Sequence, residues 1–201
     1  MYKLYAITNS NATIEKIEDA VKAGVTMLQL REKELKYDDF LGKALIIKEI
    51  TDRYNIPLII NDNFEIAIKI KAAGVHLGQT DGDIEEIRKI APKDFIIGVT
   101  AKTVDQAQEA EKKGATYLGS GAVNSSKTKT DAKQITNKEL QEICSSVSIP
   151  VVAIGGITPS NVENLAGIDI NGIAVSNSIF DEKDTILATK ALLDKLGGII
   201  K

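Results

Sequence analysis

The sequence predicts a single-domain α/β protein built as a closed (β/α)₈ barrel, and three observations support this. Short runs rich in Val, Ile and Leu alternate with longer helical patterns along the whole chain, which is typical of parallel βα units. Eight such units fit into the 201 residues. No shift in composition and no Pro/Gly/Ser-rich linker divides them. One closed barrel over residues 1–201 is therefore favoured, and a doubly wound open sheet is the second choice.

The expected strands are mostly continuous apolar runs, as strands are when both faces of a sheet are covered. They span residues 3–8, 27–32, 58–62, 74–78, 95–100, 116–121, 151–155 and 172–176. Between them, apolar residues recur at helical spacing. The first helix carries Ile14, Ile17 and Val21 on one stripe and ends at Gly24, a residue suited to a helix C-terminus. The other helices are expected over residues 37–54, 63–73, 83–90, 104–113, 137–147, 161–165 and 184–196.

Composition restricts the class of partner. A net charge of −3 gives no basic field for nucleic acid. No apolar run could span a bilayer and no secretion signal is visible, so we expect a cytoplasmic protein that acts on small molecules. The single cysteine, Cys144, lies on an expected helix face and is interpreted as structural. With His76 as the only histidine, a metal ion would have to be held by oxygen ligands.

The second strand ends in a polar stretch whose side chains point alternately to the two faces of the sheet. Side chains alternate along a strand, so Gln29, Arg31 and Lys33 share one face, and Leu30 and Glu32 take the other. Burying an arginine is costly unless an anion or a carboxylate meets it. A surface strand end with a local salt bridge is the alternative interpretation. In both candidate folds, however, ligands gather at the carboxyl ends of the strands, which favours a binding role.

Two carboxylates, Asp62 and Asp81, end neighbouring strands beside these cations. Mg²⁺ commonly takes only one or two protein carboxylates and completes its shell with water and phosphate oxygens. The pattern therefore favours one Mg²⁺ that bridges to a polyanion. Helix N-capping is the alternative role for both residues. Asp83 is the better cap for the helix that follows, which leaves Asp81 available as a ligand.

The end of the seventh strand offers glycine backbone in place of charged side chains. Gly155 and Gly156 end the seventh strand and let backbone N–H groups approach an anion, as at the phosphate site of this fold. The Ser/Thr/Lys-rich loop 122–133 could cover that site or serve only as a solvated connector. His76 is expected to be a packed core histidine and Lys102 a surface lysine. Together the strand ends suggest two phosphorylated small molecules in one cavity.

Over essentially the whole chain, the sequence resembles the thiamine-phosphate synthase family. The resemblance rests on Q-L-R-E-K at 29–33, N-D-N at 61–63, A-G-V-H-L-G-Q-T-D at 73–81, G-V-T at 98–100, S-K-T-K at 126–129, A-I-G-G-I at 153–157 and N-G-I-A-V-S at 171–176. It implies a (β/α)₈ fold and a transferase. That enzyme joins 4-amino-2-methyl-5-(diphosphooxymethyl)pyrimidine to 4-methyl-5-(2-phosphooxyethyl)thiazole, giving thiamine phosphate and pyrophosphate by a dissociative mechanism.

The resemblance also implies roles for individual residues. The pyrimidine diphosphate would be held by Gln29, Leu30, Arg31, Glu32, Lys33, Asn61, Thr100 and Lys129. The thiazole phosphate would be held by Ser126, Lys127, Thr128, Gly156, Val175 and Ser176. Asp62 and Asp81 would bind one Mg²⁺. Arg31, Lys33 and Lys129 would act in catalysis by stabilising the leaving diphosphate.

The chain departs from the family pattern at a few positions. The run Gly121–Ser125 lacks the usual prolines before the S-K-T-K motif, Ser126 replaces a usual Thr, Thr100 replaces a usual Ser, and Asn9 replaces a usual Asp. These changes bear on closure of the loop more than on the chemistry.

Other functions remain open from the sequence. A related thiazole tautomerase has a similar fold, but it has no diphosphate to neutralise, so the retained cations and carboxylates favour the synthase. A non-catalytic thiamine-phosphate binding protein would share the site without turnover. A generic sugar-phosphate isomerase would leave the carboxylates unexplained. Parallel barrels often associate through their helix faces, and a homodimer is expected on that ground alone.

Overall fold

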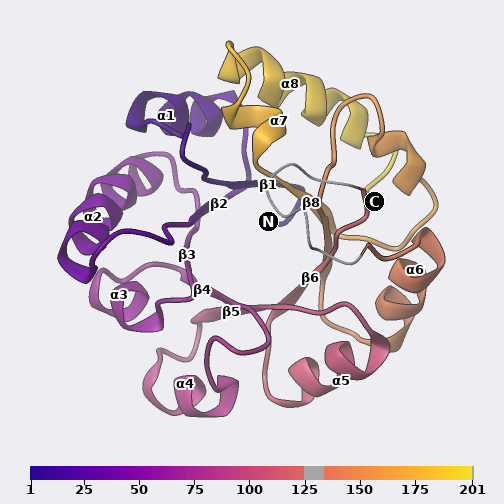
Figure 1. Cartoon of the computed structure of the whole chain (residues 1–201), viewed down its shortest axis with the longest axis horizontal. Helices are drawn as coiled ribbons and strands as arrows, with labels where there is room; N and C mark the ends of the chain where they lie inside the picture. Colours follow the sequence, from indigo (N-terminus) through magenta and orange to yellow (C-terminus); the bar gives the residue numbers. More distant parts are fainter. Residues whose placement is uncertain (125–133, 201) are drawn as a thin grey trace.

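The chain folds into a closed parallel barrel, seen end-on in Figure 1. The computed structural model describes residues 1–124 and 134–200. Each strand pairs with the next in sequence order and the last pairs with the first, which excludes the open sheet. The strands are β1 (Leu4–Ile7), β2 (Met27–Leu30), β3 (Leu58–Asn61), β4 (Gly74–Leu77), β5 (Ile96–Thr100), β6 (Tyr117–Gly121), β7 (Val151–Ile154) and β8 (Gly172–Val175).

Helices surround the barrel as an outer ring (Figure 1). They are α1 (Ile14–Ala23), α2 (Tyr37–Arg53), α3 (Phe64–Lys69), α4 (Ile84–Ile90), α5 (Val104–Lys112), α6 (Asn137–Ser146), the 3₁₀ helix η1 (Val162–Leu165), α7 (Asn177–Phe180) and α8 (Thr185–Leu196). Within the part of the chain that the structure describes, none of them is long and apolar enough to cross a membrane.

Most predicted elements are confirmed to within a residue or two, and the exceptions have physical causes. The helix expected over 63–73 ends at Lys69, and Lys71 adopts a left-handed φ of 55°. The apolar spacing continues past the helix because Ile70 and Ala72 remain buried after the backbone has left the helical path. Helix α7 was not predicted, because a single turn is too short to show a periodic pattern.

Side chains with defined roles fix where the helices begin and end. Thr13 accepts a hydrogen bond from the Lys16 N–H at the start of α1, and Gly24 ends that helix at a φ of 113°. Thr136 and Glu139 form a reciprocal capping box at the start of α6. These caps set the lengths of the loops that carry the strand-end residues.

Two apolar cores lie on opposite sides of the sheet. The larger fills the space between the strands and the helices and includes Leu28, Leu30 and Ile60. The smaller lies inside the barrel and is formed by Tyr5, Ile7, Met27, Ile59, Tyr117, Val152 and Ala174. Inward positions that follow these residues towards the strand ends are polar, as Gln29 and Asn61 show. The barrel interior is therefore closed by apolar packing below and open to polar chemistry above.

Candidate active site

A cavity of about 490 Å³ opens at the carboxyl ends of the strands. Its walls come from all eight strands, from the loops that directly follow them, and from helix α7 and the residues after it. Ten residues that the sequence assigned to the site line it: Gln29, Arg31, Lys33, Asn61, Asp62, Asp81, Thr100, Gly156, Val175 and Ser176. The structure therefore brings together residues that lie up to 147 positions apart in the sequence (176 − 29).

The end of β2 shows the alternation that the sequence predicts. Gln29, Arg31 and Lys33 face the cavity. Leu30 is fully buried in the outer core, and the Glu32 carboxylate forms an ion pair with Lys43. Neither Leu30 nor Glu32 lines the cavity, because one-residue alternation sends both side chains to the helix side of the sheet.

The backbone of Arg31 is anchored to the first strand. The Arg31 N–H donates to the Thr8 hydroxyl, with 2.9 Å between N and Oγ1. Thr8 directly follows β1 and is buried. This contact ties the β2 end to the β1 end, so the guanidinium starts from a fixed backbone. We infer that Thr8 determines where Arg31 enters the cavity.

Asp62 and Asp81 are not used as helix caps. Asn63 caps α3 by accepting from the Ile66 N–H, and Asp83 caps α4 by accepting from the N–H groups of Glu85 and Glu86. The expectation that Asp83 caps its helix is confirmed. Both carboxylates of the pair are thus left to the cavity, and Asp81 is steadied by the Gly78 N–H, 2.8 Å from its Oδ2.

The two carboxylates interact with each other. Partial burial raises the pKa of the Asp62 carboxyl, and the charge and hydrogen bonding of Asp81 raise it further, whereas Lys33 opposes the rise. Asp62 also adopts a φ of 62°, in the left-handed region that few residues other than glycine occupy. Such a conformation is costly and persists where surrounding structure imposes it, often at functional sites. This arrangement suits a cation that lies between the carboxylates of Asp62 and Asp81.

The β7 and β8 ends present backbone rather than charged side chains. Gly155 and Gly156 have φ values of 102° and 60°, a conformation that glycine adopts without steric cost. A Cβ at Gly155 would lie 2.6 Å from the Cα of Ala122, so only glycine fits there. Nearby, the buried Oγ of Ser176 has no hydrogen-bond partner among the described residues. A hydroxyl in this state is a ready partner for an anionic oxygen at the cavity wall.

Comparison with known proteins assigns the chain to a family. Residues 4–179 match the family model for thiamine monophosphate synthase. The chain belongs to the thiamine monophosphate synthase family. It is 45% identical over 194 residues to the thiamine-phosphate synthase of Methanobrevibacter smithii, covering 94% of this chain and 93% of that protein. It is 47% identical over 183 residues to the thiamine-phosphate synthase of Clostridium acetobutylicum, covering 89% and 87%.

A solved structure agrees. The thiamine phosphate pyrophosphorylase of Pyrococcus furiosus superposes on the chain with a TM-score of 0.92 at 34% identity, covering 99% of this chain and 97% of that one. The predicted barrel and the family resemblance are both confirmed. The chain is an enzyme of the thiamine-phosphate synthase family, a transferase of thiamine biosynthesis.

Four residues that the resemblance assigns to the substrates lie outside the described residues: Ser126, Lys127, Thr128 and Lys129. The segment that leads into them is described. Its N–H groups at Val123 and Asn124 donate to the carbonyl oxygens of Ile154 and Gly155, at 3.0 and 3.1 Å. This pairing fixes the segment on the β7 end without the prolines that are usual in thiamine-phosphate synthases.

Another departure from the family pattern also has a structural reason. The amide nitrogen of Asn9 donates to the Asp181 carboxylate at 2.9 Å and to the Asn177 side chain at 3.3 Å. An aspartate at position 9 would place a second negative charge against Asp181. Asn9 therefore joins the loop after β1 to the α7 region, which lines the cavity beside Ser176.

The sequence missed several residues that line this cavity. Tyr5 and Tyr117 lie buried at its floor and are joined by a hydrogen bond. His76 is largely buried, as expected, but it also lines the cavity, and Lys102 adds a cation to the wall. The sequence does offer one signal for both tyrosines, because each occupies an inward-facing position of its strand. Sequence alone does not say which strands face each other across the barrel.

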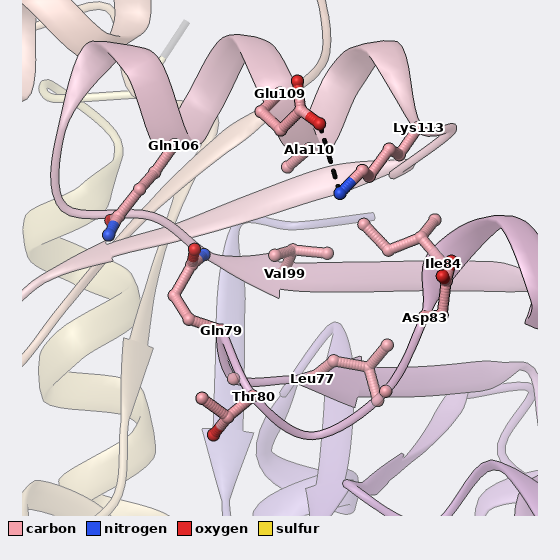
Figure 2. Close-up of a pocket in the computed structure, with 12 residues that line it drawn as sticks. Leu77, Gln79, Thr80, Asp83, Ile84, Val99, Gln106, Glu109, Ala110 and Lys113 are labelled. Carbon is pink, nitrogen blue, oxygen red and sulfur yellow. Dashed lines mark ion pairs between the residues drawn. The ribbon is translucent and has the colours of Figure 1, made fainter.

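A second, smaller hollow of about 260 Å³ lies between the loop after β4 and helix α5, and Figure 2 shows its walls. Glu109 and Lys113 form an ion pair of 3.1 Å along one wall (Figure 2). Gly78 borders both hollows, but none of the predicted site residues lines this one. The described residues that the sequence assigned to the site therefore gather at the larger cavity.

Proposed function

We propose that the chain condenses 4-amino-2-methyl-5-(diphosphooxymethyl)pyrimidine with 4-methyl-5-(2-phosphooxyethyl)thiazole, giving thiamine phosphate and pyrophosphate. The observation that carries this proposal is that two walls of one cavity differ in their chemistry. Cations and a carboxylate pair lie at the ends of β2 to β4, whereas glycines and a hydroxyl lie at the ends of β7 and β8. A reaction between a diphosphate and a monophosphate requires such a division.

The diphosphate would lie against Arg31 and Lys33. A guanidinium binds phosphate oxygens through two parallel N–H bonds, whereas an ammonium acts as a point charge. The positive charge of Lys33 opposes the rise in the pKa of the Asp62 carboxyl. The Lys33 ammonium therefore lies beside the carboxylate pair. Both cations therefore surround the region where negative charge would grow as the diphosphate leaves.

One Mg²⁺ fits the pair Asp62 and Asp81. Among the described residues no group of three or more His, Cys, Asp or Glu side chains comes together. Two neighbouring carboxylates, of which Asp81 helps to raise the pKa of Asp62, are nevertheless the usual protein share of a magnesium site that also uses substrate oxygens. When bound there, Mg²⁺ would neutralise charge on the diphosphate.

The thiazole phosphate would lie at the opposite wall. Gly155 and Gly156 allow close approach of backbone N–H groups, and the Ser176 Oγ, which has no partner among the described residues, adds a donor. Val175 precedes Ser176 at the end of β8 and lines the same wall. Ser126, Lys127 and Thr128 are assigned to this phosphate by resemblance. The wall thus provides mainly neutral donors, which suits a monophosphate that is bound but does not leave.

The proposed reaction is dissociative. The C–O bond of the pyrimidine methylene breaks first, and its electron pair leaves on the diphosphate. The lone pair of the thiazole nitrogen then forms the new C–N bond with the resulting carbocation. This sequence requires no proton transfer at the reacting atoms, which agrees with a chain that holds one histidine. The residues contribute by orienting both substrates and by stabilising the leaving diphosphate through Arg31, Lys33 and Lys129.

Release of pyrophosphate tests the proposal directly. Purified protein is mixed with the pyrimidine diphosphate, the thiazole phosphate and Mg²⁺, and each component is then omitted in turn. Release that requires both organic substrates supports the transfer. Isomerisation of a thiazole without pyrophosphate release would instead indicate a tautomerase. Binding of both substrates with neither reaction would indicate a non-catalytic binding protein.

A further inference from the structure

Five hydrogen-bonding side chains, which we term the floor chain, cross the bottom of the cavity. Gln29 Nε2 lies 2.6 Å from Tyr5 Oη, which lies 2.9 Å from Tyr117 Oη. Tyr117 Oη lies 2.9 Å from His76 Nδ1, and His76 Nε2 lies 3.1 Å from Thr100 Oγ1. The five residues come from five different strands, and all of them line the cavity. The contacts therefore join Gln29 and Thr100, two predicted substrate contacts, across the barrel.

One direction of the floor chain gives every phenol and imidazole proton an acceptor within these contacts. An amide nitrogen only donates, so Tyr5 accepts from Gln29, and in this direction it gives its single proton to Tyr117. Tyr117 in turn gives its proton to His76 Nδ1. Nδ1 is then the acceptor, and Nε2 carries the imidazole proton and donates it to Thr100. The Thr100 hydroxyl keeps its own proton for another acceptor.

Burial keeps both phenols of the floor chain protonated. Burial raises the pKa of both Tyr5 and Tyr117 well above that of an ordinary phenol, so each keeps its proton at neutral pH. The backbone also leaves room for the chain. A Cβ at Gly98 would lie 2.1 Å from the ring of Tyr117, and one at Gly119 would lie 3.1 Å from the ring of His76. Two glycines on β5 and β6 thus make space for the two rings.

We propose that the floor chain holds His76 in its Nε2–H form and thereby makes Thr100 a hydrogen-bond donor to the pyrimidine substrate. Tyr5, Tyr117 and His76 act as positioning residues. With its nitrogen facing Tyr5, the Gln29 amide keeps its oxygen as an acceptor at the other end. An aminopyrimidine ring offers an amino donor and ring-nitrogen acceptors, the complementary pattern. The identity of this ligand rests on the proposed function, whereas the direction of the chain does not.

Nitrogen NMR of the single histidine tests the direction without any substrate. The chain contains one histidine, so untagged protein labelled with [¹⁵N]histidine gives one imidazole and needs no assignment. At about pH 8 an ordinary imidazole is neutral. The expected spectrum shows the Nε2–H form alone, with Nδ1 shifted upfield because it accepts a hydrogen bond. The Nδ1–H form would reverse the chain and overturn the proposal, and so would a fast-exchanging mixture of both forms.

Variants separate the role of the floor chain from simple packing. In Tyr117→Phe, the Nδ1 resonance should move downfield because its donor is lost. The KM for the pyrimidine diphosphate should rise about tenfold, as expected for loss of a buried hydrogen bond, while the KM for the thiazole phosphate stays within about twofold. Tyr2→Phe is the matched control, because the Tyr2 ring packs against Tyr117 at 5.1 Å but does not line the cavity. It should change neither the resonance nor either KM.

Thr100 provides a second pair of variants at the cavity wall, where folding is less at risk. Thr100→Val should raise the KM for the pyrimidine diphosphate about tenfold, and Thr100→Ser should restore it. Equal KM values for wild type, Thr100→Val and Tyr117→Phe would overturn the positioning role. If wild-type protein transfers nothing, the proposed function fails. The NMR spectrum then still decides the direction of the chain by itself.

Discussion

Asp62 and Asp81 meet at the ends of β3 and β4, and partial burial together with the charge of Asp81 raises the pKa of the Asp62 carboxyl. The two residues are available for this contact because Asn63 and Asp83 cap the helices that follow. A difference of one position in the first loop and of two in the second therefore separates the capping residue from the site residue. The pair is the most specific sign of a cation site in the described part of the cavity.

The Asp62 carboxylate should destabilise the protein at neutral pH when Mg²⁺ is absent. Its pKa in the folded chain lies above its ordinary value of 3.8, so the folded state binds the proton more tightly. The resulting stabilisation is present below the ordinary value and is lost as pH rises through the raised one. Asp62→Asn should therefore unfold about 1–2 °C higher than wild type at pH 7, a small shift because the group is partly solvated.

Added Mg²⁺ should reverse this order. At tenfold excess over Kd, a bound ligand adds about 1.4 kcal/mol, which is about 3–5 °C for a chain of this size. Wild type should gain this stability in thermal unfolding and Asp62→Asn should not. Asp83→Asn is the matched control, because it removes a carboxylate from the next loop while asparagine still caps α4. An equal gain for wild type and Asp62→Asn would contradict the metal site.

Arg31→Gln should lower kcat/KM for the pyrimidine diphosphate by about 10²-fold, since a preorganised charge beside the leaving group is lost. Steady-state kinetics with saturating thiazole phosphate measures this change. Lys36→Gln removes a charge from the same loop, but Lys36 is exposed and lies outside the cavity. That control should remain within about twofold of wild type. Similar losses in both variants would mean that the charge of the loop, and not Arg31, matters.

Lys129→Ala should lower turnover by about 10² or more for the same electrostatic reason. This prediction comes from the resemblance to the family, since Lys129 lies outside the described residues. Lys138→Ala is a suitable comparison, because that lysine is largely exposed on α6 and pairs only loosely with Glu142, at 3.9 Å. Unchanged turnover in Lys129→Ala would exclude Lys129 from catalysis.

Two glycine substitutions should have opposite effects on stability. In Gly98→Ala the new Cβ would meet the Tyr117 ring, and overpacking of this kind costs about 1–3 kcal/mol. In Gly42→Ala, on helix α2, a Cβ would meet nothing within 4 Å, so the higher helix propensity of alanine should add about 0.5–1 kcal/mol. Thermal unfolding should therefore place Gly98→Ala below wild type and Gly42→Ala above it. A Gly98→Ala variant that unfolds at or above the temperature of wild type would contradict the packing of Tyr117.

The sequence predicted the parts of the site that follow from local rules. Alternation along β2 was enough to place Gln29, Arg31 and Lys33 on one face, and cap preference was enough to separate Asp83 from Asp81. The floor chain could not be predicted in this way. Tyr5 and Tyr117 lie 112 positions apart, and they meet only because barrel closure points the inward side chains of β1 and β6 into the same interior. The end of α3 was missed for a related reason, because apolar spacing reports burial and not backbone conformation.

The most direct test of the account is Mg²⁺-dependent formation of thiamine phosphate, measured together with pyrophosphate, in wild type, Asp62→Asn and Asp83→Asn. We predict that wild type and Asp83→Asn form the two products in equal amounts when Mg²⁺ and both substrates are present. Asp62→Asn should be slower by about 10² or more at the same Mg²⁺ concentration. Full activity in Asp62→Asn, or wild-type turnover that ignores Mg²⁺, would contradict the claim that the carboxylate pair holds the metal for this transfer.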